Sequence, residues 1–192
     1  MPCKDNNEEK KNSMDSFEVL QKTRTVVISE EVSQKLAARV CNQLLYLQEL
    51  SNDPIKILLN TQGGHVEAGD TIHDMIKFVR PEIIMIGTGW VASAGILIYL
   101  AAKKENRYSL KNTRYLIHQP SGGAYGQATD IKIEAEEITK MKKRLNKIIS
   151  DGTGQPLDKV TKDSDRNFWL GAEEAIEYGI VNKIITSIKE IK

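Results

Sequence analysis

The residues best suited to nucleophilic catalysis are Ser93, His118 and the glycine pair Gly63-Gly64. Ser93 stands among small residues where a predicted strand meets a helix, and a helix N-terminus would favour negative charge at its hydroxyl. A helix-capping serine is the alternative reading. His118 ends a predicted strand and precedes Gln119-Pro120, which keeps the chain extended. These features make His118 the candidate general base, with a structural histidine as the alternative.

Gly63 and Gly64 follow a predicted buried strand and open a helix. Glycines allow unusual backbone angles that aim N–H groups at a ligand, as an oxyanion hole requires, although an ordinary turn between strand and helix has the same composition. His65 is either a neighbour of the site or a solvated side chain, and His73 is expected on the surface of its helix. No H-x-x-x-H or C-x-x-C spacing occurs, and no P-loop or G-x-G-x-x-G, so we expect no metal, nucleotide or other cofactor.

The elements that must position these residues alternate between strand and helix patterns. TVVI (25–28), IKILLN (55–60) and EIIMIG (82–87) are expected to be strands. Between them lie two amphipathic helices, one with Leu36, Val40, Leu44 and Leu47 on its apolar face, the other ending at Pro81. This alternation predicts parallel βαβ units and an α/β fold.

The second half of the chain continues the pattern. TRYLIH (113–118) predicts a strand, and a glycine-rich extended stretch follows at 121–126. A long helix is expected over about 129–150, apolar on one face and charged on the other. A helix over 172–178 and a strand over 180–185 complete the chain. Residues 1–16 are polar and predict a flexible arm, whereas 17–192 predict a single domain.

Composition excludes several classes of protein. The 192 residues include 27 basic and 26 acidic side chains, so a formal charge of +1 predicts neither a nucleic-acid nor a membrane partner. Only two cysteines occur, which argues against a disulfide framework and favours a reducing compartment. The N-terminus lacks the apolar segment of a secretory signal. A cytoplasmic protein is therefore expected.

Several of these segments, in this order, resemble the ClpP family, the proteolytic subunits of bacterial ATP-dependent Clp proteases. The resemblance extends from about residue 15 to residue 185. It is carried by five short runs, NTQGG (60–64), GWVASAG (89–95), IHQP (117–120), GQATDI (126–131) and EAIEYG (174–179). The resemblance implies a crotonase-like α/β subunit with a protruding long helix at about 129–150, through which two seven-membered rings stack.

The resemblance also implies roles for individual residues. Ser93 would attack the peptide carbonyl, and His118 would accept the serine proton. The backbone N–H groups of Gly64 and Ala94 would form the oxyanion hole. The strand that pairs with the substrate backbone would be formed by Ser121, Gly122, Gly123, Ala124 and Tyr125. Asp165 and Arg166 would make contacts across the ring junction.

The third member of the catalytic triad departs from the family pattern. In register with Arg166 and with Leu170-Gly171-Ala172, Asn167 stands where the family has an aspartate, 49 residues after His118. A neutral amide can orient the imidazole but does not stabilise the imidazolium as a carboxylate does. We therefore expect weakened activity and resemblance to an atypical second ClpP paralogue.

Two hypotheses follow. The first is a serine endopeptidase that degrades unfolded polypeptides delivered by an AAA+ Clp ATPase. The second is a degenerate structural or regulatory subunit that assembles with an active ClpP paralogue. Either would form a homo- or hetero-tetradecamer of two heptameric rings. A third hypothesis is crotonase-type acyl-CoA chemistry, which would also use the Gly63-Gly64 pair as an oxyanion hole. That chemistry gives no role to the pair of Ser93 and His118.

Overall fold

A seven-stranded sheet organises residues 15–191, the part of the chain that the computed structural model describes. The path β1-β2-β3-β4-β7 is parallel throughout, and β5 also pairs with β3, beyond the end of β4. Only β6 is antiparallel, to β5. The strands are β1 (Thr25–Ile28), β2 (Ile55–Thr61), β3 (Ile83–Ala92), β4 (Arg107–Leu110), β5 (Arg114–Ile117), β6 (Phe168–Leu170) and β7 (Lys183–Ile185). This topology is the α/β fold predicted from the sequence.

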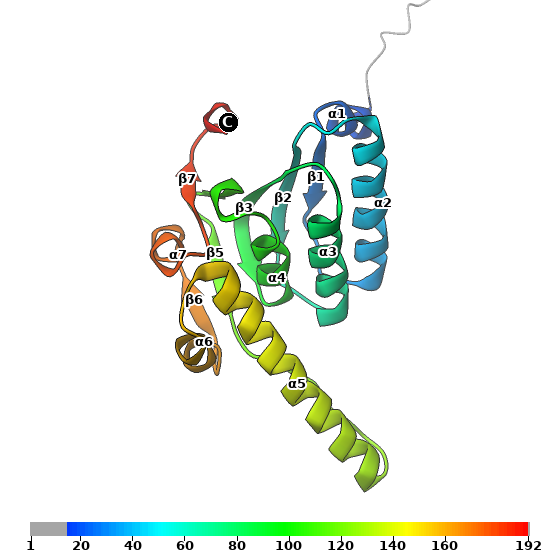
Figure 1. Cartoon of the computed structure of the whole chain (residues 1–192), viewed down its shortest axis with the longest axis vertical. Coiled ribbons are helices and arrows are strands. Elements are labelled where there is room, and N and C mark those ends of the chain that lie inside the picture. The colour runs from blue at the N-terminus through cyan, green and yellow to red at the C-terminus, as the bar shows by residue number, and fades with distance from the viewer. Residues whose placement is uncertain (1–14, 192) are drawn as a thin grey trace, which may run out of the picture.

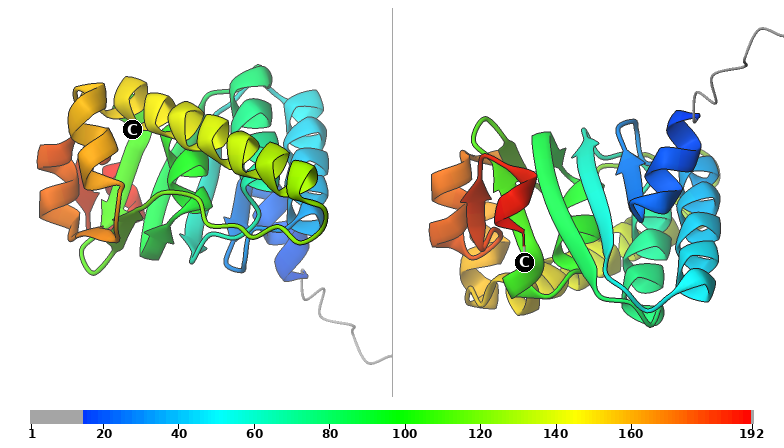
Figure 2. Two further views of the ribbon diagram at one scale, coloured as in Figure 1. Left: turned by 90° about the horizontal axis from the view of Figure 1, so that it is seen from below. Right: turned by 90° about the horizontal axis from the view of Figure 1, so that it is seen from above.

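Helices cover one face of the sheet and build the main core there (Figures 1 and 2). In α2 (Gln34–Leu50), the Ser33 side chain caps the helix by accepting the backbone N–H of Leu36. The apolar face predicted for this helix is buried, as Leu36, Val40, Leu44 and Leu47 all are. Beside it lie α3 (Val66–Phe78) and α4 (Ala94–Leu100), and the described chain also includes α1 (Ser16–Lys22), α6 (Leu157–Asp163) and α7 (Ala172–Tyr178).

The long helix α5 (Ala128–Thr153) projects from the body of the subunit (Figure 1). Its C-terminal part is anchored, because Leu145 and Ile149 are buried and α5 packs on α4. A bidentate ion pair also ties Arg144 of α5 to Asp70 of α3, with two N–O distances of 2.7 Å. The projecting half keeps apolar side chains in solvent, with Ile133 51% exposed. The predicted helix is confirmed: it begins one residue before Thr129 and ends three residues after Ser150.

Other sequence predictions met mixed outcomes. The predicted helix over 172–178 coincides with α7, whereas the predicted strand over 180–185 is reduced to β7. His73 was expected on the surface, and this was wrong. It is 8% exposed because α4 packs on α3 at this position, and its Nδ1 lies 2.7 Å from the carbonyl oxygen of Leu97. Of the predicted arm, residues 1–14 lie outside the described residues, and α1 begins at Ser16. Within residues 15–191, none of the helices combines the length and the apolar character that crossing a bilayer would need.

Candidate active site

Ser93 occupies a strained turn between β3 and α4. Its backbone angles are φ 55° and ψ −121°, in a region that non-glycine residues rarely adopt. The backbone N–H donates to the carbonyl of Leu116 in β5, at 3.0 Å, which helps to hold the turn. The side chain makes no capping hydrogen bond to α4, so the capping interpretation of this serine is wrong. The hydroxyl makes no hydrogen bond to any described residue and lies at the N-terminus of a buried helix.

The glycine pair allows a second turn to pack directly on the first. Gly63 has φ +96°, and a Cβ built there would lie 2.6 Å from the Cβ of Ser93. Gly64 has φ +144°, and its N–H makes no hydrogen bond within the part of the chain that the structure describes. Ala94 is the first residue of α4, so its N–H has no partner inside the helix. Within residues 15–191, the N–H groups of both predicted oxyanion donors, Gly64 and Ala94, therefore make no hydrogen bond.

Replacing Gly64 with alanine should destabilise the protein by about 2–4 kcal/mol, since it combines overpacking with an unfavourable φ. The new Cβ would lie 2.3 Å from the carbonyl oxygen of Val32, an atom already engaged by the N–H of His65. Chemical denaturation measures the loss. Gly123→Ala is the matched control, because nothing lies within 4 Å of a Cβ at that position. Equal unfolding free energies for the two variants would contradict the packing described for Gly64.

His118 and Asn167 are brought together by strand pairing. In the antiparallel ladder of β5 and β6, Ile117 lies opposite Phe168, so the next pair outward is His118 and Asn167. The Nδ1 of His118 lies 3.1 Å from the Oδ1 of Asn167. With the amide oxygen accepting from Nδ1–H, the lone pair of the imidazole is left on Nε2. This tautomer is the one that can accept a proton from a serine.

The loop that carries Asn167 is fixed from both sides. Gln119 donates its backbone N–H to the carbonyl of Ser164, at 2.6 Å, and its side-chain amide to the carbonyl of Asp165, at 2.7 Å. The fully buried Ser164 hydroxyl donates to the amide oxygen of Asn146 on α5, at 3.0 Å. The loop therefore joins the long helix to the residues beside His118.

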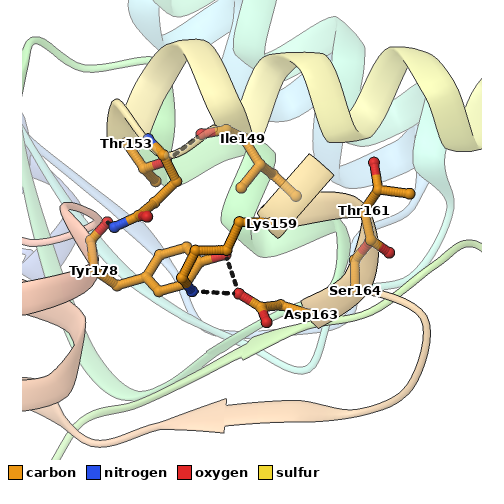
Figure 3. Close-up of polar contacts among 8 residues, drawn as sticks. Ile149, Thr153, Lys159, Thr161, Asp163, Ser164 and Tyr178 are labelled. Atoms are coloured by element: carbon orange, nitrogen blue, oxygen red, sulfur yellow. Dashed lines mark hydrogen bonds and ion pairs between the residues drawn. The ribbon is translucent and has the colours of Figure 1, made fainter. Parts of the chain in front are cut away.

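A second polar cluster holds the helix that precedes this loop. Figure 3 shows Lys159 and Tyr178 both directed at the carboxylate of Asp163, at 2.6 and 2.9 Å. Burial, and the hydrogen bond to Asp163, raise the pKa of the Tyr178 phenol, so it remains a donor at neutral pH. The Lys159 ammonium also lies 4.4 Å from the centre of the Tyr178 ring. These contacts fix α6 against α7 and thereby the start of the loop.

Ser93 and His118 line one small cavity of about 20 Å³, which we call the Ser93 cavity. Its other walls are apolar and come from α3, α4, α5 and the chain around β5, with Val66, Leu97, Pro120, Leu145 and Ile149 among them. Leu145 belongs to the buried face of α5, and it reaches the cavity because α5 packs on α4. Among the described residues no hydrogen bond joins Ser93 to His118. Catalytic pairs of this kind often close only when substrate binds.

The predicted substrate-binding segment, Ser121 to Tyr125, runs from Pro120 along α5 and is not part of the sheet. Gly122 lies against α5, since a Cβ there would be 3.1 Å from a side-chain atom of Ile138. No backbone hydrogen bond joins residues 121–125 to any other described segment. Their N–H and C=O groups are therefore available for pairing with an extended peptide.

The predicted ring-contact residues lie beside Asn167 on the surface. Asp165 forms an ion pair with Lys142 of α5, at 3.1 Å. Arg166 is exposed and forms no ion pair with the described part of the chain. His65 pairs with Glu67 at 3.2 Å, on the first turn of α3. Within residues 15–191, no group of three or more histidine, cysteine, aspartate and glutamate side chains is arranged to hold a metal ion.

Comparison with known proteins places the chain in a family. A model of the Clp protease family matches residues 7–188. The chain is 56% identical to the ATP-dependent Clp protease proteolytic subunit 3 of Rhizobium meliloti over 191 residues, which covers 97% of this chain and 98% of the relative. It is 55% identical to the proteolytic subunit 2 of Pseudomonas aeruginosa over 170 residues, with 88% and 85% covered.

Solved structures agree with this assignment. ClpP1 of Listeria monocytogenes is 57% identical and superposes with a TM-score of 0.83, over 92% of this chain and 99% of that one. An asparagine-to-aspartate mutant of the same ClpP1 is also 57% identical and superposes with a TM-score of 0.86, over 91% and 98%. On sequence and fold alike, the chain belongs to the Clp protease family of serine peptidases.

Proposed function

We propose that the chain is a serine endopeptidase subunit in which Ser93 is the nucleophile and His118 the general base. This proposal is carried by one observation: the two side chains line the same cavity, and Asn167 is hydrogen-bonded to Nδ1 of the His118 imidazole. His118 accepts the serine proton through Nε2 as Oγ attacks the peptide carbonyl, and then gives it to the leaving amine. The N–H groups of Gly64 and Ala94 stabilise the oxyanion.

The apolar walls of the Ser93 cavity suit an apolar side chain before the scissile bond, which must be small or displace these walls because the cavity measures only about 20 Å³, while residues 121–125 pair with the peptide backbone. Because the amide of Asn167 is neutral, the developing imidazolium lacks a counter-charge at this position. We therefore infer a low intrinsic activity. The complete set of Ser93, His118 and oxyanion donors favours this reading over a purely structural subunit, and hydrolysis of a fluorogenic peptide by the purified chain tests it.

The working unit that we propose is a barrel of two stacked heptameric rings, formed by this chain alone or with a ClpP paralogue. It acts in the cytoplasm on unfolded polypeptides supplied by an AAA+ Clp ATPase. The ATP-dependent names of the relatives support the ATPase partner. The exposed apolar side chains on the projecting half of α5, Ile131 and Ile133, support stacking through this helix.

Substitution of Arg166 tests whether this residue lies at the junction between the two rings. We expect Arg166→Glu to split double rings into single ones and to lower activity, because a cation with no partner in its own described chain would be replaced by an anion facing the other ring. Light scattering measures the mass. Lys162→Glu, which reverses the same charge one turn earlier, on α6, is the control and should leave the mass unchanged. A double-ring mass retained by Arg166→Glu would remove Arg166 from the junction.

A further inference from the structure

A second hollow, which we call the Trp90 pocket, lies beside the catalytic turn. It measures about 210 Å³, and its walls include Glu30, Glu31, Gln62 and Trp90. Two chain segments approach the catalytic site, one ending in the glycine turn and the other in the turn at Ser93. The Trp90 pocket is lined by residues that precede these turns, Gln62 and Trp90. The Ser93 cavity is lined by residues that follow these turns, among them Val66 and Ala94. The two hollows share no lining residue, so they are separate sites beside the catalytic turn.

An irregularity in the sheet directs Trp90 into this position. Leu59 pairs with Gly87, but Thr61 pairs with Val91, so β3 carries two additional residues against β2. Gly89, within this bulge, has φ +61°. The amide oxygen of Asn60 accepts the backbone N–H of Trp90 at 3.3 Å, and its nitrogen donates to the Ser29 hydroxyl at 3.2 Å. Bulges beside active sites commonly redirect one side chain, and this one is fixed by hydrogen bonds.

The Trp90 ring is held for contact on an exposed surface. It is 41% exposed, and it stacks on Trp169 with the ring centres 6.5 Å apart and the planes 7° from parallel. The neighbouring Trp169 already binds a cation on the face of its indole ring: the Arg114 guanidinium carbon lies 4.3 Å from the centre of that ring. Over Trp90 there is no such cation among the described residues.

One of the two carboxylates in the pocket has no partner among the described residues. Glu30 is neutralised by an ion pair with Arg39, from α2. Glu31 makes no hydrogen bond or ion pair with any described residue. Its side chain lies against the oxyanion turn, since a Cβ built on Gly64 would be 2.9 Å from the Cγ of Glu31. Within residues 15–191, the pocket therefore offers one negative charge that is not neutralised, together with one aromatic surface, beside the catalytic turn.

We propose that the Trp90 pocket binds a lysine or arginine side chain of the peptide, on the leaving-group side of the scissile bond. The proposal rests on the proposed function. With the carbonyl between Gly64 and Ala94 and the preceding side chain in the Ser93 cavity, the leaving half of the peptide extends toward Trp90. A long basic side chain can place its stem on the indole and its charge beside Glu31.

The test uses assembled protein and short quenched-fluorescent peptides that carry lysine or norleucine at the first, second or third residue after the cleaved bond. Norleucine keeps the length of the lysine stem but removes the charge. At one of these positions we expect kcat/KM to favour lysine by about tenfold. Glu31→Gln and, separately, Trp90→Leu should bring this ratio close to one. Glu67→Gln removes an exposed carboxylate that does not line the Trp90 pocket and should leave the ratio unchanged.

Equal kcat/KM values for lysine and norleucine at all three positions would overturn the proposal, as would a preference that survives both Glu31→Gln and Trp90→Leu. A direct binding measurement separates this failure from failure of the proposed catalytic residues. On the Ser93→Ala protein, fluorescence anisotropy should show tighter binding of the lysine peptide, and Glu31→Gln should abolish the difference. Equal affinities in that background would also overturn the proposal, whatever residue performs the chemistry.

Discussion

Replacing Ser93 with alanine is expected to reduce peptide hydrolysis by at least about 10³-fold, since the nucleophile of a serine peptidase has no substitute. The alanine removes one oxygen from a turn whose backbone is held by Gly63 and Leu116, and the side chain caps no helix. We therefore expect no change in folding or ring assembly. The measurement is kcat/KM on a fluorogenic peptide, at an oligomeric state verified by light scattering.

Ser187→Ala provides the matched control for this experiment. That serine lies before a short 3₁₀ helix, Ile188–Glu190, and its hydroxyl serves only a local capping role. Its removal should leave hydrolysis within about twofold of the unsubstituted protein. If the Ser93→Ala protein, properly assembled, retained the original rate, the proposed mechanism would be wrong.

Asn167→Asp is expected to raise hydrolysis by about tenfold or more. A carboxylate facing Nδ1 can only accept a hydrogen bond, whereas an amide can rotate and offer its NH₂ group, which selects the wrong tautomer. The carboxylate also stabilises the imidazolium that forms as Ser93 loses its proton. In a chymotrypsin-type triad, the reverse change costs about 10⁴ in kcat. We expect less here, because Asn167 is exposed and water weakens the new interaction.

Asn167→Ala is the control that isolates orientation from charge. It removes the hydrogen bond to His118 without adding a carboxylate, so its rate should fall below that of the unsubstituted chain. The three proteins should therefore rank aspartate, asparagine, alanine when compared as double rings. An unchanged or lower rate for Asn167→Asp in that comparison would mean that the neutral amide does not limit catalysis.

The sequence predicted best those elements whose burial follows a simple period. β1 and α7 fall within the predicted boundaries, and the four apolar positions of α2 are all buried. Short elements were missed. β6 has only three residues and owes its existence to pairing with β5, and α6 has a single buried residue, Val160. Such short elements contain too few residues to show a periodic pattern of apolar side chains, so the sequence alone does not reveal them.

The candidate site divides in the same way. The spacing of 49 residues put Asn167 in register with His118, and the ladder of β5 and β6 gives the physical reason, since these residues directly follow and precede a paired position. The positive φ of Ser93 could not be predicted from the neighbouring sequence, because glycine is the residue that usually adopts this conformation. Trp90 was overlooked because only the bulge at Gly89 turns it out of the strand pattern.

Covalent labelling can show whether Ser93 is an activated nucleophile. Assembled protein is treated with a fluorophosphonate probe, which reacts with serines that an adjacent base activates, and the modified residue is located by peptide mass spectrometry. We predict a single adduct, on Ser93, that is lost in His118→Ala and forms faster in Asn167→Asp. An adduct on another residue, or none on Ser93 in intact double rings, would show that Ser93 is not the nucleophile and would favour a structural subunit that assembles with an active paralogue.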